Sequence, residues 1–259
     1  MTEPGDLAHA ARRLGELHAV GRPLLLVNVW DAAGAAAVSA AGSPVVATSS
    51  VAMAIARGGA DNNRDRDAAF AQLRQITAAV GVPVTADLEG GYDLDPDDLV
   101  GALLDAGAVG CNIEDTDHAS GGGLLDAEAH ATYLAGVRAA ADRHGVGVVL
   151  NARIDAILHH PQHDPEASLA EVVRRAKLYY EAGADCVYPI TLSDPDVIAR
   201  VVQELDRRPV NVNVSDPLAA LAEAGAARIS LGGGVFMWMM HELDLRTRRL
   251  IQGDATAFT

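Results

Sequence analysis

The stretch VTADLEGGYD, residues 84–93, joins a β-branched run to two carboxylates and a pair of glycines. The residues before Asp87 are typical of a buried strand, and Asp87 and Glu89 stand two residues apart at its end. Side chains at positions i and i+2 of a strand point to the same side, so the two carboxylates should converge if the strand persists. Like charges this close repel each other unless a cation or a proton lies between them. The surrounding fold must therefore supply one or the other.

Seven further apolar runs resemble this one, and helical stretches rich in Ala, Leu and Arg separate them. The eight runs cover residues 24–30, 44–49, 82–87, 108–114, 146–153, 184–189, 209–214 and 226–232. The clearest helical stretches cover residues 66–80, 95–106, 126–144, 166–182 and 194–206. Eight strands that alternate with helices predict the α/β class and, within it, a (β/α)₈ TIM barrel.

Helix start and stop signals agree with this division of the chain. Asp-Pro pairs place proline in the first helical turn at Asp95-Pro96, Asp164-Pro165, Asp194-Pro195 and Asp216-Pro217. Gly107, Gly183 and Gly225 stand where a helix should end just before a strand. A doubly wound open sheet is the rival architecture. It would require a glycine-rich phosphate loop after the first strand, and NVWDAAG (28–34) is not such a loop.

Composition limits the classes of function. The formal charge of −15 argues against a nucleic-acid surface, which needs a basic stripe. No apolar run approaches the roughly 20 residues of a membrane span. The two cysteines, Cys111 and Cys186, lie inside apolar runs and predict buried thiols in a reducing compartment, so we expect a cytoplasmic protein. No linker or low-complexity segment divides the chain, which predicts a single barrel domain over residues 1–259.

Polar side chains gather at the carboxyl ends of the predicted strands, where barrels carry their chemistry. Three carboxylates, Asp87, Glu89 and Glu114, follow neighbouring strands. Oxygen ligands without clustered His or Cys suit Mg²⁺ or Mn²⁺ rather than Zn²⁺. Mg²⁺ takes one or two carboxylates directly and keeps several waters, so one acid should bind the ion while the others hold its waters. Alternatively, the three acids are separate helix caps and loop charges.

Arg153 ends the fifth run, in a rim otherwise rich in acids. Its guanidinium could pair with a substrate carboxylate or phosphate through two parallel hydrogen bonds. The alternative is a structural ion pair with Asp155 or Glu114, and both arrangements can hold at once.

Two loops add candidate groups. Ser49, Ser50 and Val51 begin a loop whose backbone N–H groups could bind an anion. The stretch DTDHASGGGLLD (115–126) is glycine-rich, which predicts a lid, and His118 is its clearest acid/base group.

Five ordered blocks carry a resemblance to a known group of enzymes. They are NVWDAAGA (28–35), VVATSSVAMA (45–54), VPVTADLEGGY (82–92), CNIEDT (111–116) and LNARIDA (150–156). In order and spacing they resemble the isocitrate lyase/phosphoenolpyruvate mutase superfamily, over roughly residues 22 to 234. The resemblance implies a (β/α)₈ barrel of the phosphoenolpyruvate-binding type that binds Mg²⁺, or Mn²⁺, and a small anionic 2-oxo or 2-hydroxy carboxylate. Its members make or break a C–C or P–C bond beside a metal-stabilised enolate.

The matching positions carry the family's roles onto this chain. Asp87 would ligate the metal and contact the substrate, with Glu89 and Glu114 holding the metal partly through water. Arg153 would contact the substrate carboxylate, and Asp61, in GGADNN (58–63), matches an acidic position near the site.

The remaining expected site residues are of two kinds. The amides of Ser50 and Val51 would bind the other end of the substrate. We expect further substrate contacts from Trp30, Ser49 and Asn211, and a catalytic role for His118 beside Arg153 and Asp61.

The 115–126 stretch departs from the subfamilies of this group. Isocitrate and methylisocitrate lyases carry a Lys-Lys-Cys-Gly-His-type motif here, and the mutases carry Lys and Asn, whereas this stretch has no Lys, Cys or Asn. What remains is chemistry that needs little beyond metal and enolate, such as decarboxylation or retro-aldol cleavage. The chain therefore resembles the oxaloacetate decarboxylase-like branch and is expected to be a Mg²⁺-dependent C–C lyase.

Two alternatives stay open. One is P–C bond chemistry, as in phosphonopyruvate hydrolase or phosphoenolpyruvate mutase, and the other is a non-catalytic metabolite-binding homologue. The resemblance also implies a homo-oligomer, a dimer or tetramer, because C-terminal helices of this family often swap between subunits. Trp238 and the neighbouring Met237, Met239 and Met240 predict packing of the eighth helix.

Overall fold

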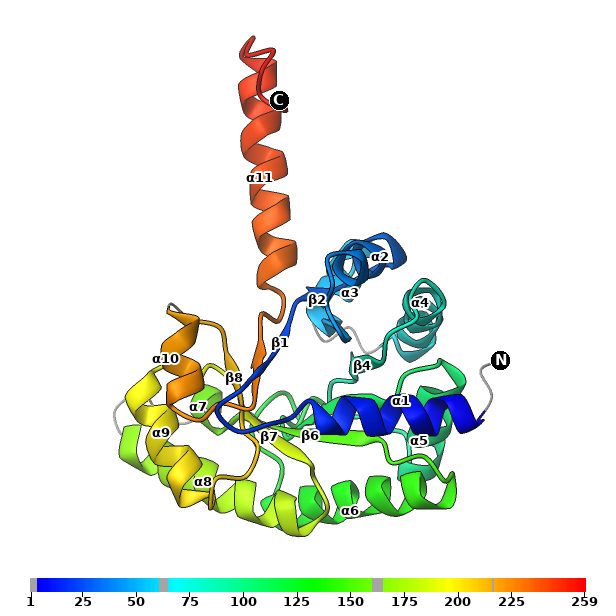
Figure 1. Cartoon of the computed structure of the whole chain (residues 1–259), viewed down its shortest axis with the longest axis vertical. Helices are drawn as coiled ribbons and strands as arrows, with labels where there is room; N and C mark the ends of the chain where they lie inside the picture. The colour runs from blue at the N-terminus through cyan, green and yellow to red at the C-terminus, as the bar shows by residue number, and fades with distance from the viewer. Residues whose placement is uncertain (1–3, 61–64, 160–164, 216) are drawn as a thin grey trace.

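Parallel strands alternate with helices along the chain (Figure 1). The computed structural model describes residues 4–60, 65–159, 165–215 and 217–259. The strands of this part are β1 (Leu24–Leu26), β2 (Asn28–Val29), β3 (Val46–Thr48), β4 (Val84–Asp87), β5 (Gly110–Glu114), β6 (Val149–Ile154), β7 (Cys186–Pro189), β8 (Asn211–Asn213) and β9 (Arg228–Ser230). Each coincides with one of the eight predicted apolar runs, although β6 extends one residue beyond its run of 146–153. β1 and β2 are two pieces of the first run.

The strands form a ring. β2 to β7 pair in chain order as parallel neighbours, and β1 pairs with β9, which pairs with β8. A parallel bridge between Val187 and Val210 connects β7 to β8. The two parallel sheets follow one another around the ring, and β1 and β2, which belong to one stretch, are shared between them. This arrangement of eight strand positions agrees with the predicted (β/α)₈ barrel.

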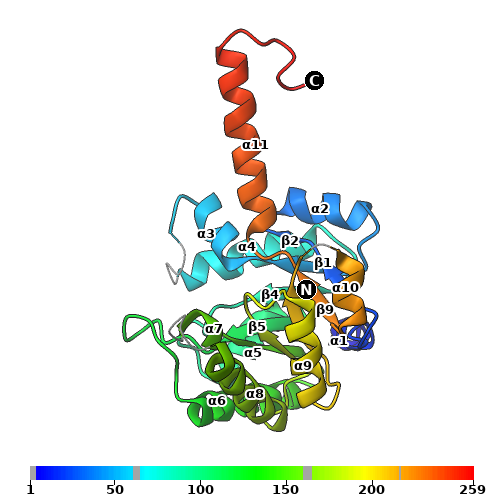
Figure 2. The same cartoon turned by 90° about the vertical axis from the view of Figure 1, so that its left-hand side faces the viewer.

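Helices follow the strands around the outside of the ring (Figures 1 and 2). They are α1 (Pro4–Glu16), α2 (Ala32–Ala40), α3 (Ser50–Ala56), α4 (Arg66–Ala78), α5 (Pro96–Asp105), α6 (Ala127–Arg143), α7 (Ala156–His159), α8 (Pro165–Glu181), α9 (Pro195–Glu204), α10 (Leu218–Glu223) and α11 (Gly234–Ile251). In the part of the chain that the structure describes, no helix is long and apolar enough to cross a membrane.

The predicted helix boundaries are confirmed where the structure describes them. Asp95 and Asp194 cap α5 and α9 by accepting hydrogen bonds from the backbone N–H groups that follow. Asp164 and Asp216 lie outside the described residues. Gly107, Gly183 and Gly225 have φ angles of 83°, 99° and 97°, in the left-handed region that ends helices.

The first helix belongs to the amino-terminal side of the barrel. Leu14 on α1 is fully buried, and a Cβ at Gly110, the first residue of β5, would lie 2.6 Å from its Cδ2. Only glycine therefore lets α1 come this close to the start of β5.

The last helix departs from the prediction. α11 projects away from the barrel as a long rod (Figures 1 and 2), and Phe236 is its one buried residue. Trp238 is 62% exposed and Met237 59% exposed. The prediction that these residues pack the eighth helix is therefore wrong within this single chain. Helical periodicity predicts an apolar face but does not determine what covers it.

Candidate active site

A cavity of about 550 Å³ lies at the carboxyl ends of the barrel strands. Residues from the ends of every strand position except β8, or from the loops beyond them, line it, which is the arrangement expected of a barrel active site. Its lining includes Asn28, Ser49, Ser50, Val51, Asp87, Asn112, Glu114, Thr116, His118, Gly121, Gly122, Arg153, Asp155, Leu158, His159, Tyr188, Ile190, Ser230, Gly232 and Gly233.

Asp87 is the last residue of β4, and the loop after β3 holds its carboxylate. Its Oδ2 accepts hydrogen bonds from the Ser50 backbone N–H at 3.0 Å and from the Ser50 hydroxyl at 2.8 Å. The Asp87 backbone N–H donates to the Thr48 hydroxyl at 2.9 Å. The other carboxylate oxygen, Oδ1, is buried and has no hydrogen-bond partner among the described residues. The loop thus fixes one oxygen and leaves the second available for a ligand.

Glu114 ends β5 and is 2% exposed. Its Oε1 contacts His118 Nε2, and its Oε2 pairs with the Nη1 of Arg153. Burial raises the pKa of Glu114, and the hydrogen bond to Glu114 raises the pKa of His118. Both shifts favour a proton on the His118–Glu114 pair. His118, predicted as an acid/base group, is therefore held at the cavity rather than in solvent.

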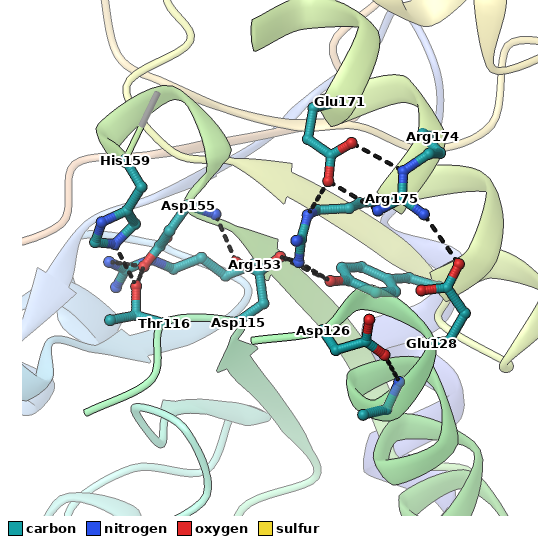
Figure 3. A network of polar contacts seen from close by, with 12 residues as sticks. Asp115, Thr116, Asp126, Glu128, Arg153, Asp155, His159, Glu171, Arg174 and Arg175 are labelled. Carbon is teal, nitrogen blue, oxygen red and sulfur yellow. Dashed lines mark hydrogen bonds and ion pairs between the residues drawn. The ribbon is translucent and has the colours of Figure 1, made fainter. Parts of the chain in front are cut away.

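Arg153 forms a second ion pair besides that with Glu114. Its Nε and Nη2 donate to the two carboxylate oxygens of Asp155, at 2.7 and 3.0 Å (Figure 3). Burial disfavours the charged guanidinium, but the carboxylates of Glu114 and Asp155 outweigh it and raise the pKa of Arg153. The structural ion pair considered from the sequence is present, and Arg153 also lines the cavity where an anion would bind.

Asp155 connects Arg153 to two further loops. Its Oδ2 accepts from the Thr116 hydroxyl at 2.5 Å, and that hydroxyl lies 3.0 Å from His159 Nε2 (Figure 3). Its backbone N–H donates to Asp115 Oδ1 at 2.8 Å. The ends of β5 and β6 are thereby tied together beneath the 115–126 loop.

Asp115 is itself supported from α8. Its Oδ2 accepts from Arg175 Nη1 at 3.0 Å and from the Tyr179 hydroxyl at 2.7 Å. Arg175 Nε in turn donates to Glu171 Oε1 at 2.7 Å (Figure 3). This buried layer holds the acids of the β5 end rigidly.

Glu89 lies in a different place from the one that strand alternation predicts. The strand ends at Asp87, and Glu89 has a φ angle of 52°, so its side chain does not continue the alternation. It is buried, lines a neighbouring cavity of about 140 Å³ and lies 3.5 Å from the Tyr92 hydroxyl. Its backbone carbonyl accepts from the Glu114 N–H at 3.0 Å. His118 lines both this cavity and the main one.

The other predicted residues divide into three groups. Ser49 and Val51 line the main cavity, and the Ser49 hydroxyl caps α3. Trp30 instead packs edge-on against Phe236, and Asn211 is fully buried with its Oδ1 accepting from the Ser230 hydroxyl at 3.1 Å. Neither is part of the cavity lining, and Asp61 lies outside the described residues.

The carboxylates at the cavity determine whether it can hold a hard divalent cation. No group of three or more His, Cys, Asp or Glu side chains gathers around one point in the described part of the chain. The buried, unpartnered Oδ1 of Asp87 nevertheless provides one carboxylate oxygen, and the carboxylate of Glu114 lines the same cavity. A Mg²⁺ ion with one direct carboxylate and several waters fits this set.

Sequence reasoning missed Asn112 and Asn28. Asn112 lines the cavity two residues before Glu114, and its polar side chain inside an apolar run was the available signal. The Oδ1 of Asn28 accepts from the backbone N–H groups of Leu231 and Gly232, at 3.1 and 2.8 Å. It therefore joins the first strand to the loop that precedes α11.

Comparison with known proteins identifies relatives over most of the chain. A family model described as phosphoenolpyruvate phosphomutase matches residues 14–251. An uncharacterised protein of Mycobacterium tuberculosis is 30% identical over 221 residues, which are 84% of this chain and 80% of that protein.

Solved structures agree. A candidate phosphonomutase from Burkholderia cenocepacia J2315 has a TM-score of 0.87 and 36% identity, covering 94% of this chain and 99% of that one. A candidate lyase or mutase from the same organism has a TM-score of 0.86 and 30% identity, covering 96% of this chain and 90% of that one. A 2,3-dimethylmalate lyase shares the fold, with a TM-score of 0.79 at 21% identity, covering 96% of this chain and 88% of that one. The chain is thus a member of the phosphoenolpyruvate phosphomutase family.

Proposed function

We propose that this protein is a Mg²⁺-dependent lyase that cleaves a C–C bond of a small 2-oxo or 2-hydroxy carboxylate. The observation that carries the proposal is the carboxylate of Asp87. Ser50 holds its Oδ2 through two hydrogen bonds, while its buried Oδ1 has no partner among the described residues. A buried, unpartnered carboxylate oxygen is costly unless a ligand completes it, and a hard cation is the ligand that suits it.

The residues around Asp87 supply the rest of the site. Asp87 would hold the metal directly, with Glu114 and Glu89 acting through water. When bound, Mg²⁺ supplies positive charge against the oxyanion that develops as a bond beside a carbonyl breaks. Arg153 adds fixed positive charge at the cavity wall, where the substrate carboxylate would lie. The Nε–H and one N–H of Nη2 already donate to Asp155, so the substrate would accept from the remaining N–H groups of Nη1 and Nη2.

His118 is the proposed donor of the proton that the substrate carbon accepts when its C–C bond breaks. Its Nε2 is hydrogen-bonded to Glu114, and the raised pKa values of both groups favour a proton on this pair. The glycines at 121 and 122 line the cavity in the same loop, so closure of this loop over a substrate would exclude water.

Thermal denaturation with oxalate, a mimic of the enolate, tests the metal site. We expect oxalate to raise Tm only when Mg²⁺ is present, and Asp87→Ala to abolish that shift. Asp142→Asn, on the exposed side of α6, is the matched control and should leave the shift unchanged. A shift of the same size in Asp87→Ala would contradict the assignment.

A panel of 2-oxo and 2-hydroxy acids, followed by proton NMR, tests the reaction. Cleavage of at least one acid by the wild type, lowered by ~10³-fold or more in Asp87→Ala, is expected if the metal supplies several kcal/mol of stabilisation. Metal-dependent oxalate binding without turnover of any acid would instead favour a metabolite-binding homologue.

P–C bond chemistry is the second candidate, and the family match and the Burkholderia phosphonomutase favour it. Against it stands the 115–126 stretch, which lacks Lys and Asn. Incubation with phosphonopyruvate, followed by phosphorus NMR, separates the two candidates. Release of phosphate or formation of phosphoenolpyruvate would replace the C–C lyase with this second function.

A further inference from the structure

Asn112 lies at the floor of the cavity. It is two residues before Glu114 on β5, so both side chains face the barrel interior, with Asn112 roughly 7 Å deeper along the strand. Its neighbours in register are Asp87 on β4 and Asn151 on β6. Asn112 is 7% exposed, and that exposure belongs to the cavity that it lines.

The orientation of the Asn112 carboxamide is fixed by chemistry. Its Oδ1 accepts from Asn151 Nδ2 at 2.7 Å and from Arg228 Nη2 at 3.1 Å. A guanidinium has only donors, so the atom that faces Arg228 must be the oxygen. The Nδ2 of Asn112 then lies on the opposite side of the carboxamide. No hydrogen bond between described residues uses it, which leaves its N–H groups for the cavity.

Arg228 explains why this orientation is stable. It is the first residue of β9, only 1% exposed, and no described carboxylate forms an ion pair with it. Its Nε and Nη1 have no hydrogen-bond partner among the described residues, so the contact with Asn112 is its main polar anchor. A buried guanidinium kept without a paired acid is costly. Its charge and donors at the floor of the cavity favour negative charge in the space above.

We propose that Asn112 is a catalytic hydrogen-bond donor to the oxyanion of the bound substrate, and that Arg228 is the positioning residue that directs the Asn112 amide into the cavity. The proposal rests on the proposed function, because it needs an oxyanion that develops during bond cleavage. A donor held in place before the reaction stabilises such charge without reorganisation. Asp87 and Asn112 would then approach the substrate from adjacent strands.

Asn112→Asp separates this role from a structural one. The aspartate has almost the same shape, and its oxygens can accept from both Arg228 and Asn151, so the variant should melt at or above the wild-type Tm. It has no donor to offer the cavity. We expect kcat to fall by ~10²- to 10³-fold, as for the loss of one oxyanion donor, and the affinity for Mg²⁺-dependent oxalate to fall at least ~10-fold.

Arg228→Met tests the positioning step. Without the guanidinium, the Asn112 carboxamide can rotate by 180° and exchange its oxygen and nitrogen, so kcat should fall while KM changes little. Arg228→Lys should restore part of kcat, because an ammonium group also has only hydrogen-bond donors. If the Met variant does not fold, Asn112→Asp decides alone.

The outcomes are distinct. If the wild type turns over an oxo acid and binds oxalate, but Asn112→Asp does both within about threefold of wild type, the donor role is wrong and the proposed function stands. If the wild type shows neither turnover nor metal-dependent oxalate binding, the proposed function fails and the donor role fails with it.

Discussion

Arg153 and Asp155, two residues apart at the end of β6, face each other through two hydrogen bonds of 2.7 and 3.0 Å. Asp155 is 1% exposed and the Arg153 side chain 17% exposed, so the pair is largely shielded from water. Glu114 contacts the third guanidinium nitrogen, Nη1. The arginine that would meet a substrate is therefore held at the cavity wall by its own ion pairs before any substrate arrives.

Breaking this pair should be costly. Asp155→Asn keeps the shape of the side chain but leaves Arg153 with one fewer charged partner and weakens the contact with Thr116. We expect the free energy of unfolding to fall by about 3 kcal/mol, measured by urea denaturation. Glu128→Gln is the control, because it breaks a surface pair with Arg174 in which both side chains are about half exposed or more. That change should cost less than about 1 kcal/mol, and equal losses in the two variants would contradict the argument.

The barrel could be predicted from the sequence because eight apolar runs and their helix caps repeat one local pattern. Asp95 shows why this works, since an Asp-Pro pair specifies a helix start through contacts within the first turn. Glu89 shows where prediction from local sequence patterns fails. Whether β4 ends at Asp87 or two residues later depends on the left-handed turn that follows. A Cβ at Gly91 in that turn would collide with the hydroxyl of Tyr133, which lies far along the chain.

Within the candidate site, the residues at strand ends were predictable and those that position them were not. Arg153 stands out as the one basic residue among rim acids. The contact of Arg228 with Asn112 joins β9 to β5 across the barrel interior, and no local pattern links positions 116 residues apart. Trp238 illustrates the same limit, because an amphipathic pattern predicts an apolar face without naming its partner.

Ser50 should control metal affinity. Its hydroxyl and backbone N–H both hold Oδ2 of Asp87, and groups that orient a metal ligand typically contribute 10- to 100-fold in affinity. Ser50→Ala keeps the N–H contact, so we expect the Kd for Mg²⁺ to rise about 10-fold by calorimetric titration. Ser49→Ala removes the cap of α3 instead and should lower Tm without changing that Kd. A Ser50→Ala variant with wild-type affinity would mean that Asp87 does not need this support.

His130 predicts a loss of stability in mild acid. Burial, with a contribution from Arg175, lowers its pKa from 6.5 to about 4 in the folded protein. In the unfolded chain His130 binds a proton below about pH 6.5, whereas in the folded chain it binds one only below about pH 4. Stability from the neutral side chain is therefore complete above pH 6.5 and declines as the pH falls toward 4, by about 3 kcal/mol in total.

His130→Leu isolates this contribution. The difference in unfolding free energy between wild type and variant should narrow or reverse between pH 6.5 and 4, with a slope of about one proton. His18 has the same lowered pKa of about 4 through burial, so His18→Leu should flatten the remaining dependence further. Parallel pH profiles for wild type and His130→Leu would show that folding does not lower the pKa of His130.

The exposed face of α11 predicts self-association. Met240, Leu243 and Leu250 recur at helical spacing and are 39%, 51% and 49% exposed, while the helix stands clear of its own barrel (Figure 2). Leu25 on β1 and Leu218 on α10 are left 41% and 43% exposed on the barrel. Apolar surface of this extent on two separate parts of one chain is best buried by a second copy.

Sedimentation velocity over a 100-fold range of concentration tests that association. We propose a homo-oligomer in which α11 of one copy covers apolar surface of another, so the wild type should sediment as a dimer or larger. Leu243→Asp places a charge in the apolar stripe and should shift the protein toward the monomer. Asp244→Asn, one residue along the same helix, changes only a surface pair with Arg248 and should leave the oligomer intact. A wild type that remains monomeric throughout the range would contradict self-association through α11.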